Sequence, residues 1–262
     1  MIAVPTNNLK SELVQKIGRD KVLEIPSFED LPLPPELRQT IEKNYSMGFI
    51  NDALESIKTY AHNSKDNSIF MNYLHPETAL AHSSKYVIMT HARFLTLPNR
   101  VLKNFEVLID EDILYNSILV RVGSIKISTL KKALKANVFS PEKQIEIEEL
   151  LKLKDNKCCR NRNRYSLKLD MGTLKNCKTT DNLIDFAKAD CYIKQKYCIK
   201  YLSPVQLPKC KMIILSATLD ETIYNLFFPE RKIVYHEIEQ AAYKGNLIQY
   251  PCYSMSRKTI ND

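Results

Sequence analysis

The sequence predicts an α/β fold whose parallel sheet is covered by helices on both sides. Apolar runs of three to five residues recur as Ile2-Ala3-Val4, Lys85–Met89, Val107-Leu108-Ile109 and Met212–Leu215. Strands that are apolar on both faces belong to parallel sheets buried between helices. Hydrophobic residues make up 44% and charged residues 26% of the 262 residues, which is an ordinary globular composition.

The first hundred residues alternate between the two kinds of element. Leu9, Leu13, Val14 and Ile17 recur at helical spacing and predict a helix that Gly18 ends. In chain order we expect a strand at 2–4, a helix at 8–17, a strand at 21–25, a proline-rich loop at 26–35, helices at about 36–46 and 50–62, and a strand at 85–89 before a helix that Thr90 caps.

The remaining chain continues the pattern after a long interruption. We expect a strand at 107–109, amphipathic helix over 126–152 with a break near Ser140-Pro141, short helices around 181–189, and strands at 212–215, 233–235 and 247–250. Residues 1–114 and 209–262 are therefore predicted to form one α/β domain. Residues 115–208 are predicted to form a mostly helical, basic insertion.

Composition excludes several classes of protein. No apolar run approaches the roughly 18 residues that cross a bilayer, and residues 1–5 lack the basic and apolar parts of a secretory signal. The 7 cysteines are odd in number and irregularly spaced, which indicates reduced thiols and not a disulfide framework. We expect a cytoplasmic protein with no membrane partner.

The positive charge is concentrated in one segment. Residues 151–200 hold 13 Lys/Arg against 5 Asp/Glu, an excess equal to the whole net charge of +8. Such a surplus indicates a polyanionic partner, most simply nucleic acid, or else a solvated helical face. Within it Arg160, Arg162 and Arg164 alternate with asparagines beside Tyr165, a mixture suited to phosphate contact and base stacking or to an unstructured basic loop.

Polar residues follow four of the predicted strands. They are Pro5-Thr6-Asn7, Thr90-His91, Asp110-Glu111 and Ser216-Ala217-Thr218. The carboxyl ends of parallel strands form the edge at which α/β folds bind ligands. This edge is therefore the predicted functional site.

Asp110 and Glu111 have the chemistry of a nucleotide-hydrolysing site. An aspartate fixed at a strand end can hold Mg²⁺ against phosphate oxygens, and the adjacent glutamate can orient the attacking water. An acidic strand end can also be a solvated turn. Ser216 and Thr218 could sense a phosphate through their hydroxyls, or they could cap the helix that follows Leu219.

The order of these motifs resembles the DEAD/DEAH-type superfamily 2 helicases, and within them the DinG/XPD-like branch. Pro5-Thr6-Asn7 is similar to motif Ia, Asp110-Glu111-Asp112-Ile113 to motif II, and Ser216-Ala217-Thr218 to motif III. A strand ending in a polar residue and His, here Thr90-His91, precedes motif II in that branch. A long insertion separates motifs II and III there, as it does here.

The resemblance implies a RecA-like first motor domain with ATP and Mg²⁺ as cofactors and single-stranded DNA or RNA as partner. Asp110, which would hold Mg²⁺ through ATP, and Glu111 would be catalytic. Asp112, Ser216, Ala217 and Thr218 would couple ATP to nucleic acid. Contacts to nucleic acid would come from Pro5, Thr6, Asn7, Thr90, His91, Arg160, Arg162 and Arg164. His91 could equally be a structural histidine at a helix start.

The chain departs from the family in two motifs. The phosphate-binding sequence G-x-x-x-x-G-K-[ST] is absent, so we expect it upstream of Met1 and the second motor domain beyond Asp262. In motif II, Asp112 and Ile113 replace the usual residues. Ile113 cannot hydrogen-bond to Ser216 or Thr218, so either Asp112 makes that contact or the coupling is weaker.

The cysteines raise the question of a metal. Relatives hold an iron–sulfur cluster between motifs Ia and II, but no cysteine precedes Cys158, so no such cluster is expected here. The later cysteines contain no Cys-x-x-Cys pair, which favours ordinary thiols over zinc. The six near the insertion are Cys158, Cys159, Cys177, Cys191, Cys198 and Cys210.

Three functions remain open. The leading hypothesis is part of an ATP-driven helicase that is inactive as this chain alone. The second is a non-catalytic remnant that binds nucleic acid, and the third is a cysteine-rich metal-binding interaction protein.

Overall fold

The computed structural model divides the chain into two compact units, Met1–Leu219 and Asp220–Asp262. The residues that it describes are 1–64, 66–81, 83, 85–118, 122–164, 171–176, 179, 181–203 and 207–237.

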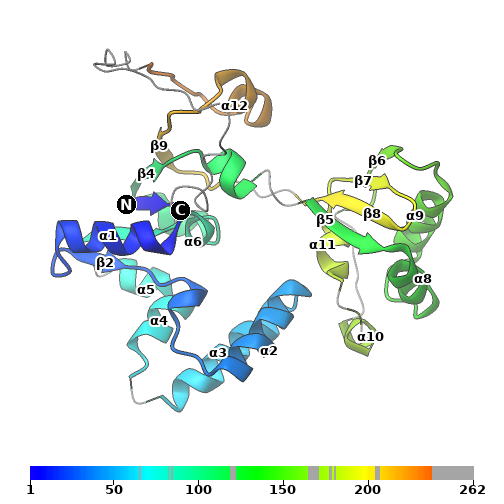
Figure 1. Cartoon of the computed structure of the whole chain (residues 1–262), viewed down its shortest axis with the longest axis horizontal. Helices are drawn as coiled ribbons and strands as arrows, with labels where there is room; N and C mark the ends of the chain where they lie inside the picture. The colour runs from blue at the N-terminus through cyan, green and yellow to red at the C-terminus, as the bar shows by residue number, and fades with distance from the viewer. Residues whose placement is uncertain are drawn as a thin grey trace, which may run out of the picture. The chain divides into compact units, whose positions relative to one another are not determined.

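The first unit contains a five-stranded sheet in which every pair of neighbours is parallel. The strand order is β2-β3-β1-β4-β9 (Figure 1). Its strands are β1 (Ile2–Val4), β2 (Val22–Glu24), β3 (Tyr86–Thr90), β4 (Glu106–Asp110) and β9 (Lys211–Leu215). The prediction of an α/β fold with a parallel sheet is confirmed.

Helices fill the intervals between these strands, and those at 68–74, 76–81 and 99–102 were not predicted. They are α1 (Asn7–Ile17), α2 (Pro35–Ser46), α3 (Ile50–His62), α4 (Ser68–Leu74), α5 (Pro76–Ala81), α6 (His91–Phe94) and α7 (Asn99–Leu102), with a 3-10 turn at Phe28–Asp30. Val14 of α1 packs against Val22 and Ile88 of the sheet. Lys10, on the same helix, is fully buried, and its ammonium pairs with Asp30 and, at 3.0 Å, with Glu24.

Helices α2 to α4 share an apolar cluster that includes Ile41, Ile57 and Phe70. Arg93 of α6 connects this cluster to the sheet region. Its guanidinium lies 4.6 Å from the centre of the Tyr73 ring and donates to the Tyr73 carbonyl. The Tyr73 hydroxyl is in turn 2.9 Å from that of Tyr45.

The segment between β4 and β9 folds around a second sheet, which the sequence analysis did not anticipate. Its four antiparallel strands have the order β5-β8-β7-β6 (Figure 1). They are β5 (Val122–Lys126), β6 (Cys158–Arg160), β7 (Cys191–Lys194) and β8 (Cys198–Leu202). The accompanying helices are a π-helical turn (Leu114–Ile118), α8 (Ile127–Lys135), α9 (Pro141–Lys152), α10 (Met171–Asn176) and α11 (Leu183–Lys188).

One face of this antiparallel sheet packs on the helices. Phe186, Tyr192 and Tyr201 form its aromatic centre, with ring centroids 4.8 Å and 5.7 Å apart for the two pairs that include Phe186. Gly123 pairs with Tyr201, and a Cβ there would lie 2.1 Å from the tyrosine ring. Glycine is therefore required at 123 because the ring covers the backbone.

The second unit contains α12 (Glu221–Phe227), which begins at the cap residue Asp220. Its buried Tyr224 packs on Phe228, and the Tyr235 hydroxyl donates to the Glu221 carbonyl at 3.2 Å. The strand predicted at 233–235 is wrong, because these residues form no ladder and the Tyr235 side chain bonds to the helix instead. The strand predicted at 247–250 lies outside the described residues.

Candidate functional site

The pairing of β4 with β9 brings Asp110-Glu111, here called the acidic pair, beside Ser216-Ala217-Thr218, the predicted motif III. Asp110 is in register with Leu215, and the Glu111 backbone N–H donates to the Leu215 carbonyl at 2.8 Å. The ladder thus extends one residue past the end of β4. As a result Asp110-Glu111 lies beside the start of Ser216-Ala217-Thr218, as the sequence analysis expected.

Glu111 adopts a conformation that is costly for its residue type. Its φ is 67°, in the left-handed region that favours glycine. A non-glycine residue there costs roughly 1–2 kcal/mol, and such strain concentrates at functional sites. The side chain of Glu111 is exposed, while that of Asp110 is half-buried.

Ser216 and Thr218 bond to each other and not to a helix end. The Thr218 N–H donates to the Ser216 hydroxyl oxygen at 3.1 Å, and the two hydroxyl oxygens are 3.3 Å apart. The next helix is capped by Asp220, whose carboxylate accepts from the Ile223 N–H. The helix-cap alternative for Ser216-Ala217-Thr218 is therefore wrong, and Ala217 and Thr218 are exposed.

Asp112 caps the turn that follows it. One carboxylate oxygen, Oδ1, accepts from the backbone N–H groups of Leu114 at 2.8 Å and Tyr115 at 3.3 Å. The residue is buried, and it starts the turn at Leu114–Ile118. These two bonds give Asp112 a local capping role, and its coupling role stays a prediction.

A polar cluster connects the ends of β1 and β3 on the same edge. Thr6 caps α1 by accepting from the Leu9 N–H at 3.3 Å. The Ser27 hydroxyl donates to Asn7 Oδ1 at 2.8 Å and lies 3.4 Å from the Thr90 hydroxyl. The structure thus brings together the predicted residues Asn7 and Thr90.

Ser27 was missed by the sequence analysis. The signal available was its position three residues after Glu24 ends β2, at the same carboxyl edge as the other motifs. Pro5, the remaining predicted residue of this group, is half-buried between β1 and the Thr6 cap.

His91 lies between this cluster and the acidic pair. The imidazole is 1% exposed. Burial lowers its pKa, while the backbone groups of Asp110 and Ala3 and the Glu111 and Asp110 carboxylates oppose that shift. His91 is therefore a buried imidazole whose pKa is set first by burial and less by the charges of Glu111 and Asp110.

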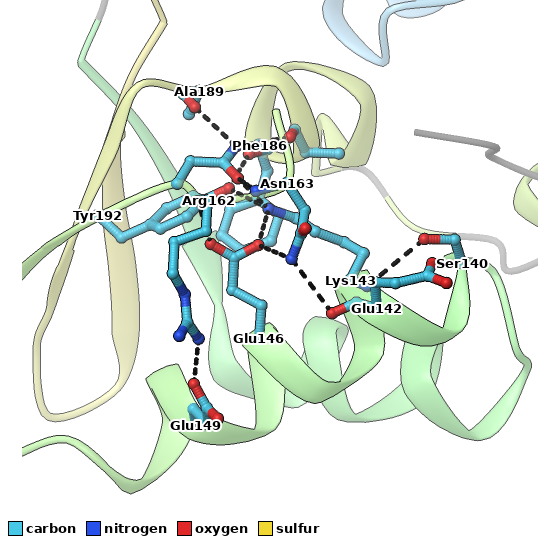
Figure 2. A network of polar contacts seen from close by, with 12 residues as sticks. Ser140, Glu142, Lys143, Glu146, Glu149, Arg162, Asn163, Phe186, Ala189 and Tyr192 are labelled. Carbon is cyan, nitrogen blue, oxygen red and sulfur yellow. Dashed lines mark hydrogen bonds and ion pairs between the residues drawn. The ribbon is translucent and has the colours of Figure 1, made fainter. Parts of the chain in front are cut away.

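The three arginines predicted to bind nucleic acid have different surroundings. Arg162 forms an ion pair with Glu149, and Arg164 forms one with Asp190. Figure 2 shows Arg162 reaching toward Glu149 of α9. Arg160 is exposed, with no ion pair among the residues that the structure describes.

A buried ion pair holds this segment in place. Lys143 of α9 is fully buried, and its ammonium donates to Glu146 at 3.0 Å, Asn161 at 2.8 Å and the Tyr192 hydroxyl at 2.7 Å (Figure 2). Glu146 also accepts from the Arg162 backbone N–H at 2.7 Å. Residues 160–164 are therefore an ordered part of the fold and not an unstructured basic loop.

The thiols offer no metal site in the described part of the chain. There, no group of three or more His, Cys, Asp or Glu residues is arranged to hold an ion. Cys158, Cys159, Cys191, Cys198 and Cys210 form no disulfide within the described part of the chain, and Cys177 lies outside the described residues. Burial raises the pKa of the Cys159 and Cys191 thiols, which keeps them protonated at neutral pH.

Comparisons with known proteins leave the family open. No family model, no curated protein and no solved structure matches the chain. Among the described residues, no helix combines the length and apolar character needed to cross a membrane.

Proposed function

We propose that this chain belongs to the first motor domain of an ATP-dependent helicase or translocase acting on single-stranded nucleic acid. The observation that carries the proposal is the register between β4 and β9. It lays Asp110-Glu111 beside Ser216-Ala217-Thr218 at the carboxyl edge of an all-parallel sheet. The cluster containing Asn7 and Thr90 lies at the ends of the next two strands of the same sheet.

The acidic pair fits Mg²⁺ and water. A carboxylate at the end of a buried strand is a hard oxygen ligand of the kind that Mg²⁺ prefers, and Asp110 would supply it. The metal would neutralise charge on phosphate oxygens. The exposed Glu111 carboxylate, one residue later and turned by its φ of 67°, would orient the water.

The chain itself contains no G-x-x-x-x-G-K-[ST] loop to hold the phosphates. The outer edge of β9 offers a place for the strand that would carry it. Among the described residues β9 pairs only with β4. Ile213 and Leu215 are each 49% exposed, which is high for apolar side chains of a parallel sheet. We propose that the phosphate-binding strand adds at this edge.

The alternative function is a remnant that binds nucleic acid without hydrolysing nucleotide. The absence of the phosphate-binding sequence from the chain favours it. Reading the nucleotide sequence upstream of the Met1 codon discriminates the two. An in-frame G-x-x-x-x-G-K-[ST] supports the motor, and a closed upstream frame supports the remnant.

The proposal is tested by ATP hydrolysis. The 262-residue chain alone is expected to release negligible phosphate, because nothing holds the β- and γ-phosphates. In the protein extended to include the phosphate-binding loop, Glu111→Gln should lower hydrolysis by about 10² or more while ATP still binds. Asp110→Asn should weaken Mg²⁺-dependent binding itself.

A matched control lies on the same strand. Glu106 begins β4 and pairs with Lys211 at the opposite end of the ladder from the acidic pair. Glu106→Gln removes the same charge and should leave hydrolysis unchanged. Near-normal phosphate release by Glu111→Gln at saturating ATP and DNA would indicate that the acidic pair is only a solvated strand end.

A further inference from the structure

The antiparallel sheet has one face that the helices leave open. Ile125, Tyr192, Ile199 and Tyr201 point toward the helices and are buried. Side chains alternate between the two faces of a strand, so the residues between these four point away from the core. These positions, here called the outer face, contain no core residue. They are positions 122, 124 and 126 of β5, 158 and 160 of β6, 191 and 193 of β7, and 198, 200 and 202 of β8.

The outer face carries positive charge and no acidic residue. Lys126, Lys200 and Arg160, from three different strands, are exposed. None of the three forms an ion pair within the part of the chain that the structure describes.

Three other cations of this region differ in that respect. Lys143, Arg162 and Arg164 are matched by Glu146, Glu149 and Asp190. The fold thus distinguishes cations that stabilise the structure from cations that are available to a partner. The sequence alone does not make this distinction.

Apolar groups lie between the charges. The register places Lys200 between Ser124 and Ile193, and Ile193 next to Cys158. Ile193 is 38% exposed and Val122, at the sheet edge, is 57% exposed. A sheet face that combines these cations with exposed apolar side chains suits a partner with both phosphates and accessible base faces.

An exposed ring lies in the turn before β8. Tyr197 ends the β7–β8 turn directly before Cys198 begins β8, and it is 74% exposed. The Lys196 ammonium lies 5.2 Å from the centre of its ring. A base can stack on such a ring while the neighbouring lysine contacts phosphate.

We propose that the outer face of the β5-β8-β7-β6 sheet is a binding surface for single-stranded nucleic acid. In a duplex the bases are stacked and paired, so a duplex would contact only the cations of this face. A single strand can also place its bases against Ile193 and Val122. The choice of nucleic acid over another polyanion rests on the proposed function. The surface itself rests on the charge and exposure described above.

The first test measures the salt dependence of binding by the whole 262-residue chain to a fluorescent single-stranded oligonucleotide. Each phosphate contact on a single strand contributes about 0.7 to the slope of log K against log salt. The triple variant Lys126→Gln, Arg160→Gln, Lys200→Gln should therefore reduce the slope by about 2 and weaken binding about ten-fold or more at 0.1 M salt.

The matched control removes the same charge from the other side of the sheet. Lys131, Lys132 and Lys135 are exposed on α8, which packs on the sheet through Leu130 and Ala133. Changing these three lysines to Gln should leave the slope within about 0.5 of the unaltered chain. Equal losses in the two triple variants would overturn the proposal, because they would indicate attraction by net charge alone.

The second test needs no substitution. Cys158 is exposed on the outer face, and Cys210 precedes β9 of the other sheet. Saturating oligonucleotide should slow alkylation of Cys158 several-fold, measured by peptide mass spectrometry, and leave Cys210 unchanged. Unchanged alkylation of Cys158 contradicts the proposal even if the triple variant fails to fold.

Competition distinguishes the partner. Polyglutamate at equal charge concentration should displace the oligonucleotide poorly, and a duplex of the same sequence should bind more weakly than the single strand. Displacement by polyglutamate would make the surface a general polyanion site and refute the nucleic-acid assignment. Both tests are independent of ATP. Normal binding at the outer face with no ATP hydrolysis by the protein extended to include the phosphate-binding loop refutes the motor proposal alone. ATP hydrolysis by that extended protein with no binding at the outer face refutes this inference alone.

Discussion

Removal of the Lys143 ammonium should unfold the insertion at much lower denaturant concentration. Lys143→Met keeps the length and apolar stem of the side chain but deletes all three donated hydrogen bonds, to Glu146, Asn161 and Tyr192. It leaves the Glu146 carboxylate, which is 5% exposed, without its cation. Breaking a buried ion pair in this way costs about 3–5 kcal/mol.

The structure favours the lower end of that range. Glu146 retains two donors, the Arg162 N–H at 2.7 Å and the Asn163 side-chain amide at 3.2 Å. The Tyr192 hydroxyl still donates to the Phe186 carbonyl at 2.9 Å. We therefore expect a loss of about 3 kcal/mol, which lowers the equilibrium constant for folding more than a hundredfold.

The assay is urea unfolding followed by far-UV circular dichroism, with hydrogen exchange of the β7 and β8 amides as the local measurement. Lys152→Met, at the exposed end of the same helix, is the control and should cost a few tenths of a kcal/mol. Adding Glu146→Gln to Lys143→Met removes the orphaned charge and should recover about 1 kcal/mol or more. A loss in Lys143→Met no larger than in Lys152→Met refutes the reasoning.

Two further predictions concern the carboxyl edge of the parallel sheet. Glu111→Gly relieves the backbone strain at φ 67° and should raise the free energy of unfolding by about 0.5–1 kcal/mol, measured by urea titration against Glu111→Gln, which keeps the strain. Because burial holds the folded-state pKa of His91 below 6.5, the unfolded chain takes up this proton first. The free energy of unfolding should therefore fall as the pH drops below 6.5. Part of that fall should be absent in His91→Gln, and an equal pH dependence of the two proteins would contradict this prediction.

The parallel sheet could be predicted because its strands are apolar on both faces and short. Val107-Leu108-Ile109 and Met212–Leu215 need no alternation to be recognised, and their polar ends give the site directly. The prediction that Asp110 and Ser216 lie close together follows from this strand pattern. Ser27 did not, since Ile25-Pro26-Ser27 has the composition of an ordinary loop.

The antiparallel sheet escaped prediction for a physical reason. Its strands are short, and half of their positions carry Lys, Arg, Ser or Cys, which interrupt any apolar run. Cys158-Cys159-Arg160 becomes a strand only because Cys191–Lys194 pairs with it across a long separation in sequence. The roles of the arginines depend equally on distant residues, because Asp190 pairs with Arg164 only after β7 has been placed.

The register Val122 with Leu202 has a consequence for the order of folding. β4 and β9 are direct neighbours although their first residues are 105 positions apart in the chain. Closing a free loop of that length is slow and entropically costly. Once β5 pairs with β8, the entry and exit of the intervening segment are held together. Only the 11 residues between β4 and β5 and the 8 between β8 and β9 then remain to be closed, which reduces the entropic cost by about 1.5 kcal/mol. The antiparallel sheet therefore holds the end of β4 and the start of β9 close together. We expect β9 to join the parallel sheet only after the antiparallel sheet has formed.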